Sequence, residues 1–289
     1  MAARIVRSDL AVEHEGVVLS GSLWLPDRAP RSAIVMHPGS GPSDRHNDVY
    51  FPPIRSLLLD AGHAVASFDK RGVGMSTGSL TTTSIDQQAG DLLACATAVR
   101  AAVPGVPVGA FGHSQGGWVV FEAAARRSGL DFVIANSGPA VSTVVQERYA
   151  LASTSEALTD AFALLVSLAQ EGVDLEVARE AVASARPSAI LLAGLVEDAD
   201  TWHLARLIFG HDPARALDAI AVQLLALYGA EDAVVPVQAS VELLERRVPP
   251  ELLQVCVLPG GDHRLQRDGE LVDGYAAALL GFVDLQCAS

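Results

Sequence analysis

The chain has 289 residues, 50% of them hydrophobic, which is enough for one large domain with a substantial apolar core and an insertion. Its formal net charge of −14 excludes partners bound through clustered cations, namely nucleic acids and anionic membranes. The N-terminal residues form no apolar signal core, no run of about 18 apolar residues occurs, and three separated cysteines fit reduced thiols. We therefore expect a cytoplasmic protein that uses no metal and no cofactor.

Short apolar runs alternate with helical patterns along most of the chain. A hairpin-like pair over 9–13 and 17–25 comes first, and an amphipathic helix is predicted over Ile85 to Ala102. Core strands are predicted near 32–36, 63–68, 106–111, 132–136, 223–229 and 252–258. This alternation indicates an α/β fold with a mostly parallel central sheet covered by helices on both faces.

The alternation stops between residues 139 and 219, where only helices are predicted. These span Val141 to Ala152, Ser155 to Gln170, Leu175 to Arg186, Ser188 to Val196 and Asp200 to Phe209. We interpret 139–219 as a helical cap inserted into a core domain made of 1–138 and 220–289; ordinary surface helices are the alternative. Apolar side chains such as Phe162 and Leu165 mostly form the cap's core, and we expect a few of them, with Trp202, to line the substrate pocket.

A G-x-S-x-G pattern over Gly112-His113-Ser114-Gln115-Gly116-Gly117 carries the clearest chemistry. The pattern follows an apolar strand and begins a helix, which is the context in which such a serine becomes exposed on a sharp turn. The flanking glycines remove Cβ atoms that would collide in that turn. The pattern predicts Ser114 as a nucleophile, with His113 as a packed neighbour.

A serine hydroxyl needs a histidine base and an orienting carboxylate, and both follow later strands. The strand over 224–229 leads to the adjacent carboxylates Glu231 and Asp232, and the strand over 253–258 leads to His263. The carboxyl ends of such strands meet at one edge of the sheet, so these loops can converge on Ser114. The turn one strand earlier, 134–138, holds no carboxylate. The residues themselves leave Glu231 and Asp232 both open as the acid.

An oxyanion-binding loop is expected after an early strand. The strand over 33–36 is followed by His37-Pro38-Gly39-Ser40-Gly41-Pro42. One donor is expected to be the backbone N–H of Gln115, and the other to come from this loop. Pro38 has no N–H, so Ser40 is the favoured second donor and Gly39 the alternative. A plain Gly/Pro turn is the competing interpretation.

Five motifs follow one another along the chain and begin at His37, Phe68, Gly112, Gly229 and Gly261. This ordered set resembles the bacterial α/β-hydrolase serine esterases, a group similar to the catalytic domains of acylaminoacyl-peptidase-type enzymes, and the resemblance covers roughly residues 17 to 284. It implies an α/β-hydrolase fold, with Ser114 as nucleophile, Asp232 as acid and His263 as base. It also implies that Ser40 and Gln115 supply the oxyanion donors. The chain departs from the family at Pro38, which is an extra proline, and at Gln115, where glutamate is frequent.

Three functions fit this set of residues. The first is hydrolysis of carboxylic esters of small or medium, mostly apolar, substrates through an acyl-enzyme on Ser114. The second is the same triad used by a thioesterase, an amidase or peptidase, or an acyltransferase. The third is a non-catalytic, ligand-binding hydrolase fold, which would not need all three groups. The expected partner is a small-molecule ester or acyl substrate, and the assembly is left open between a monomer and a homodimer.

We expect Asp69 and Arg71 to hold loops beside the site in place rather than to act on the substrate.

Overall fold

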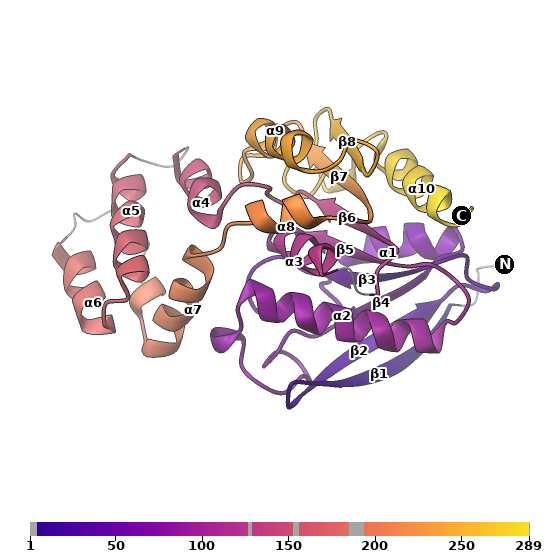
Figure 1. The fold of residues 1–289 in the computed structure, drawn as a ribbon, viewed down its shortest axis with the longest axis horizontal. Coiled ribbons are helices and arrows are strands. Elements are labelled where there is room, and N and C mark those ends of the chain that lie inside the picture. The colour runs from indigo at the N-terminus through magenta and orange to yellow at the C-terminus, as the bar shows by residue number, and fades with distance from the viewer. Residues whose placement is uncertain (1–4, 127–128, 153–155, 185–193, 289) are drawn as a thin grey trace.

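The computed structural model describes residues 5–126, 129–152, 156–184 and 194–288, and its centre is an eight-stranded sheet (Figure 1). The strand order is β1-β2-β4-β3-β5-β6-β7-β8. The strands are β1 (Val6–His14), β2 (Val17–Leu25), β3 (Ala33–His37), β4 (Ala64–Phe68), β5 (Val108–His113), β6 (Phe132–Asn136), β7 (Gln223–Gly229) and β8 (Leu253–Leu258). Every predicted strand is confirmed, with boundaries that agree to within a few residues.

The strands β3 to β8 run parallel, and the first two strands are antiparallel additions at one edge. The hairpin β1–β2 pairs its strands around Glu15 and Gly16, which both have positive φ, and β2 then pairs antiparallel with β4. Neighbours among β3, β4, β5, β6, β7 and β8 are all parallel. The carboxyl ends of the parallel strands therefore lie at one edge of the sheet, as the predicted fold class requires.

Helices cover both faces of the sheet. One face packs against α2 (Ile85–Ala102), α3 (Gln115–Ala125), α8 (Ala214–Ala219) and α9 (Val237–Arg247). The other face packs against α1 (Phe51–Asp60) and α10 (Tyr275–Gln286). The helix α2 has the predicted bounds and begins with a capping box between Ser84 and Gln87.

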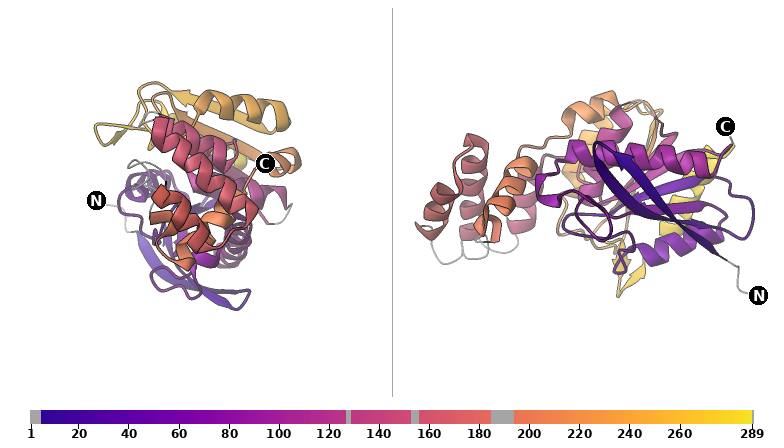
Figure 2. Two further views of the ribbon diagram at one scale, coloured as in Figure 1. Left: turned by 90° about the vertical axis from the view of Figure 1, so that its left-hand side faces the viewer. Right: turned by 90° about the horizontal axis from the view of Figure 1, so that it is seen from below.

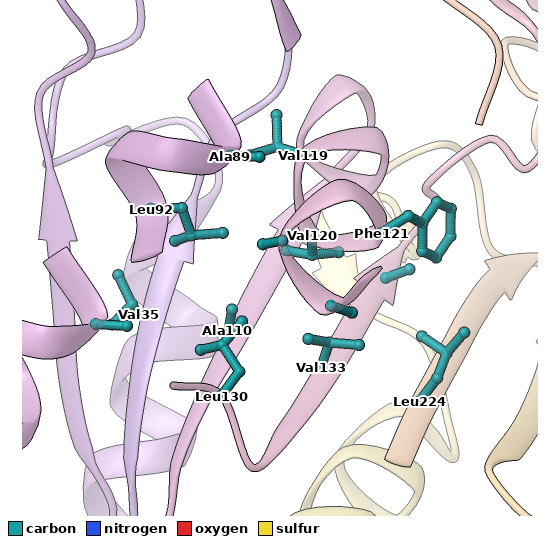
Figure 3. Packing of buried hydrophobic residues seen from close by; sticks show 14 of the residues in the cluster. Val35, Ala89, Leu92, Ala110, Val119, Val120, Phe121, Leu130, Val133 and Leu224 are labelled. Atoms are coloured by element: carbon teal, nitrogen blue, oxygen red, sulfur yellow. The ribbon is translucent and has the colours of Figure 1, made fainter. Parts of the chain in front are cut away.

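The core forms because successive strand residues point to opposite faces. In β3, Val35 faces the α2 and α3 layer, whereas Ile34 and Met36 face the α1 and α10 layer. Figure 3 shows the first layer, where Val119, Val120 and Phe121 of α3 pack with side chains of α2 and of the strands. Burial on both faces explains why these strands are continuous apolar runs in the sequence.

Four helices form a separate cluster that projects from one end of the molecule (Figures 1 and 2). They are α4 (Thr143–Ala152), α5 (Glu156–Glu171), α6 (Leu175–Ser184) and α7 (Ala199–Phe209), and three of them supply its apolar interior. The prediction of a helix over 188–196 falls mostly on residues outside the described part of the chain. The helix α8, included in the predicted insertion, packs on α3 and α9 of the core instead. Among the described residues, no helix is long and apolar enough to span a membrane.

Candidate active site

The turn between β5 and α3 holds Ser114 in a backbone conformation that few non-glycine residues adopt, with φ 54° and ψ −121°. Two hydrogen bonds fix it: the Ser114 N–H donates to the Asn136 carbonyl at 3.0 Å, and the Gly117 N–H donates to the Ser114 carbonyl at 2.7 Å. Such strain persists only where the surroundings enforce it, and it is frequent at functional sites.

The glycines of this turn are required by close approach. A Cβ on Gly112 would lie 2.0 Å from the Gly116 carbonyl oxygen, and one on Gly116 would lie 2.7 Å from the His37 carbonyl oxygen. A Cβ on Gly117 would lie 2.3 Å from the Cα of Gly138. The motif therefore lets α3, the loop after β3 and the loop after β6 converge beside Ser114.

His263 reaches the serine from the loop after β8. Its Nε2 lies 3.0 Å from the Ser114 Oγ and its Nδ1 lies 2.9 Å from the Asp232 Oδ2. The neighbouring Asp262 accepts hydrogen bonds from the N–H groups of Arg264 and Gln266, at 2.8 Å and 2.9 Å, which fixes the loop. The histidine thus bridges a hydroxyl and a carboxylate that lie on different loops.

Asp232, and not Glu231, is the carboxylate at this position. Asp232 is 4% exposed, and its second oxygen accepts the N–H groups of Val234 and Val235 at 2.8 Å and 2.9 Å. Glu231, by contrast, is exposed. Because Asp232 bonds two backbone donors with one oxygen and the imidazole with the other, the Nδ1 proton of His263 stays on the carboxylate side, and Nε2 is left to accept from the serine.

Two backbone segments flank the serine where an oxyanion would develop. The helix α3 begins at Gln115, so its N–H is among those without an acceptor inside the helix. The loop after β3 lies on the other side, where a Cβ on Gly39 would be 3.2 Å from the Ser114 Cβ. The Lys70 amine donates to the carbonyls of Gly39 and, at 3.2 Å, of Gly41. The predicted donors Gln115, Gly39 and Ser40 are therefore in segments next to Ser114.

A buried polar cluster lies behind the histidine, and most of it has no local sign in the sequence. The ring of His113 lies 4.1 Å from that of Tyr50 and 5.1 Å from that of His263, between centroids. Asn136 donates to the Tyr50 hydroxyl and accepts from the Tyr275 hydroxyl at 2.8 Å. Burial, followed by the charge of His263, lowers the pKa of His113 to about 3, so this ring stays neutral and serves as a packed neighbour.

Asp69 and Arg71 hold loops in place, as predicted. The Arg45 guanidinium donates hydrogen bonds to both carboxylate oxygens of Asp69, at 3.1 Å and 2.7 Å. The Arg71 guanidinium donates to both oxygens of Asp91, each at 2.7 Å. Burial opposes ionisation of Asp69, but the hydrogen bonds from Arg45 and from the Met75 N–H outweigh it, so the pKa of Asp69 is lowered. The Arg45–Asp69 pair fixes the segment after β4 next to the loop that follows β3, and the Arg71–Asp91 pair fixes the same segment to α2.

The side chains predicted to line a substrate pocket lie in the interior of the four-helix cluster. Trp202, Phe162 and Leu165 are 3%, 2% and 0% exposed, and the Trp202 Nε1 donates to the Val173 carbonyl at 3.0 Å. Their substrate contact stays a prediction. The cluster does reach the Asp232 loop through α4, whose Tyr149 hydroxyl donates to the Asp232 carbonyl at 3.3 Å.

The chain matches the family model described as "Serine aminopeptidase, S33" over residues 28–270. It is 28% identical over 262 residues to a monoacylglycerol lipase of Mycolicibacterium smegmatis, covering 88% of this chain and 89% of that protein. An esterase of Pyrococcus furiosus superposes with a TM-score of 0.66 at 18% identity, covering 98% and 91% of the two chains. A proline iminopeptidase of Mycobacterium smegmatis superposes with a TM-score of 0.66 at 17% identity, covering 97% and 99%.

Fold and site together define a serine hydrolase of the α/β-hydrolase class. Within that class the chain belongs to the S33 serine aminopeptidase family, because the family model matches most of its length. The resemblance to α/β-hydrolase serine esterases that the motifs indicated is confirmed.

Proposed function

We propose that this serine hydrolase cleaves carboxylic esters through an acyl-enzyme on Ser114. The observation that carries the proposal is the continuous hydrogen-bonded series from Asp232 through His263 to Ser114, with links of 2.9 Å and 3.0 Å. A hydroxyl becomes a useful nucleophile when an oriented base removes its proton. The three groups come from loops after β5, β7 and β8, and this shared position at one edge of the sheet supports their acting together.

The reaction follows from this arrangement in two halves. Ser114 Oγ attacks the ester carbonyl carbon while His263 Nε2 takes the hydroxyl proton, and Asp232 stabilises the imidazolium that forms. The oxyanion accepts hydrogen bonds from the N–H of Gln115 and from the N–H of Ser40, or of Gly39. His263 then gives the proton to the leaving alcohol, and water repeats the sequence on the acyl-enzyme. No step calls for a metal or a cofactor.

The substrate class is proposed as esters with small or medium apolar groups. The monoacylglycerol lipase relative, with 28% identity over most of both chains, supports an ester substrate. We assign α4 to α7 as a cap that shields the acyl-enzyme from bulk water, which the contacts of Tyr149 and Gln146 with the Asp232 loop support. We include Trp202, Phe162 and Leu165 as cap residues that shape chain-length preference.

Amide cleavage is the second candidate, because the family description names an aminopeptidase. The same triad can attack an amide, but the leaving amine must be protonated and the barrier is higher. Thioester hydrolysis and acyl transfer differ from the main proposal only in the leaving group or the acceptor. Matched ester, thioester and anilide substrates with one acyl group separate these activities directly.

The decisive experiment compares the wild type with Ser114→Ala on nitrophenyl esters of graded chain length. We expect the wild type to hydrolyse them and to be labelled by a fluorophosphonate, and the variant to lose roughly 10⁴- to 10⁶-fold in kcat and all labelling. Circular dichroism checks that the variant stays folded. Ester turnover or labelling that survives in a folded Ser114→Ala would overturn the proposal, and a wild type inert to every acyl substrate would favour a ligand-binding role.

The cellular setting that we propose is the cytoplasm, with a small-molecule substrate as the only partner needed for activity. The described cysteines are unpaired, which supports a reducing compartment, and the net charge of −14 supports the absence of nucleic-acid partners. Light scattering on the purified protein separates the two assemblies left open, a monomer and a homodimer.

A further inference from the structure

Lys70 is the only lysine in a chain that has 20 lysine and arginine residues in total. All the other positions that need a side-chain cation of this type carry arginine, including the buried positions Arg45 and Arg71. A single lysine in such a sequence indicates a position at which the guanidinium group of arginine is unsuitable. The residue is only 4% exposed, so solubility does not explain its charge.

Among the residues that the structure describes, the amine of Lys70 bonds the loop beside the nucleophile and no carboxylate. It donates to the carbonyls of Gly39 and Gly41. The neighbouring carboxylates form salt bridges with arginines, Asp69 with Arg45 and Asp91 with Arg71. Among the described residues, Lys70 forms no ion pair. A buried amine whose partners are loop carbonyls holds a backbone in place, because each bond fixes the direction of a peptide group.

We propose that Lys70 is a positioning residue for the hydrolysis, which sets the backbone N–H groups of the 38–41 loop for the oxyanion formed at Ser114. A peptide group is planar, with its C=O and N–H pointing in opposite directions. When Lys70 holds the Gly39 carbonyl, the N–H of the same peptide, on Ser40, points away from the lysine. Gly39 itself lies against Ser114, since a Cβ added to this glycine would be 3.2 Å from the serine Cβ. This inference deepens the proposed function and rests on it.

The space around the amine explains why the position is a lysine. The cavity that the Lys70 side chain lines measures only about 20 Å³, and Val35, His37, Gln88 and Cys95 are among the other residues that line it. An ammonium is compact and can donate in several directions, whereas a guanidinium is wide and planar. Arginine at this position would displace the loop that the amine now holds.

The charge of Lys70 changes near neutral pH, unlike the charges around it. Burial lowers its pKa to about 7. Burial and the nearby Lys70 charge lower the pKa of His37 to about 3, and burial raises the pKa of the Cys95 thiol, so both groups are neutral near pH 7. The other charged groups that line the same cavity are Asp69, Arg71 and Asp91, and each of them is held in one of the ion pairs described above.

The test compares Lys70→Met, Lys70→Arg and the control Cys95→Ala, a residue of α2 that lines the same cavity. For both Lys70 variants we expect kcat on a nitrophenyl ester to fall by about 10- to 100-fold, a fraction of the loss on removing an oxyanion donor outright, with KM nearly unchanged. Affinity for a trifluoromethyl ketone, whose adduct on the serine carries an oxyanion, should fall by the same factor. Cys95→Ala should keep both parameters.

A second measurement needs no variant and covers the case in which substitution at Lys70 prevents folding. Wild-type protein labelled with ¹³Cε-lysine gives a single lysine resonance, and we expect that resonance to shift when the trifluoromethyl ketone adduct forms. An unchanged resonance, or kcat retained in folded Lys70→Met while Ser114→Ala is inactive, overturns this inference and leaves the proposed function standing. Activity retained in Ser114→Ala overturns the proposed function instead.

Discussion

Asp232 uses its two carboxylate oxygens for different purposes. One accepts from the N–H groups of Val234 and Val235, and the other faces His263. The backbone bonds hold the carboxylate in one orientation, so the imidazole is held as well. The adjacent Glu231 is exposed and shares none of these bonds, which distinguishes two carboxylates that the sequence alone left open.

Asp232→Asn should therefore be far more damaging than Glu231→Gln. The amide keeps the shape but favours the wrong tautomer of His263, and the expected loss in kcat is about 10⁴-fold. Glu231→Gln should stay within about threefold of wild type, because an exposed carboxylate outside the hydrogen-bonded series contributes little. Steady-state kinetics on one nitrophenyl ester make the comparison; a larger loss from the Glu231 substitution would reverse the assignment of the acid.

At the scale of elements, the site depends on backbone segments that touch without side chains between them. Gly117 of α3 meets Gly138 of the loop after β6, and we expect Gly117→Ala to destabilise the protein by about 1–3 kcal/mol and to lower activity by moving the turn at Ser114. The matched control is Gly281→Ala in α10, which has open space around a Cβ and should stabilise by about 0.5–1 kcal/mol. Urea unfolding of both variants checks this prediction, and equal effects would contradict it.

The four-helix cluster gives a second prediction at this scale. Trp202 packs inside the cluster and bonds the Val173 carbonyl, so Trp202→Ala should destabilise the cluster by about 3–5 kcal/mol. If the cluster is the cap proposed above, chain-length preference among esters should change as well. Trp202→Phe keeps most of the volume and is the control. Fluorophosphonate labelling of Ser114 should be nearly equal in both. Unchanged chain-length preference in Trp202→Ala would show that the cap does not set specificity.

For the whole molecule, the features that could be predicted from the sequence are those that depend on residues close together in the chain. Buried strands are apolar runs that end in turns, and the G-x-S-x-G turn is local, so the sheet, α2 and Ser114 could all be predicted. The cluster of Tyr50, Asn136 and Tyr275 joins residues 86 and 139 positions apart, and no periodicity indicates such contacts. The bonds from Lys70 to the 38–41 loop were missed for the same reason, although its being the only lysine was a usable signal.

Stability should fall as the pH is lowered below about 6.5, the ordinary histidine pKa. Burial lowers the pKa of His37 and His113 to about 3 and that of His211 to about 4. Between those values and 6.5, the unfolded chain binds protons that the folded chain does not. Each of these histidines therefore lowers the free energy of unfolding by about 1.4 kcal/mol for each pH unit by which the pH falls in that range.

His211→Phe isolates one of these contributions. Its Nε2 is buried and has no hydrogen-bond partner among the described residues, and its ring packs edge-on against Trp118. Phenylalanine therefore keeps the packing and removes the titration. The free energy of unfolding is measured with urea at several pH values from about pH 7 to about pH 5. Below about pH 6.5, the variant's free energy should fall less steeply with pH than that of the wild type, by about 1.4 kcal/mol per pH unit. Parallel curves for the two proteins would contradict the lowered pKa of His211.

The covalent intermediate on Ser114 is the most direct measure of the proposed activity. Turnover of a nitrophenyl ester is stopped with acid, and the protein is digested and analysed by mass spectrometry. We predict that the acyl group is found on the peptide containing Ser114, that it appears with a burst of nitrophenol, and that both are absent in Ser114→Ala. An acyl group on any other residue, or ester turnover by folded Ser114→Ala, would contradict it.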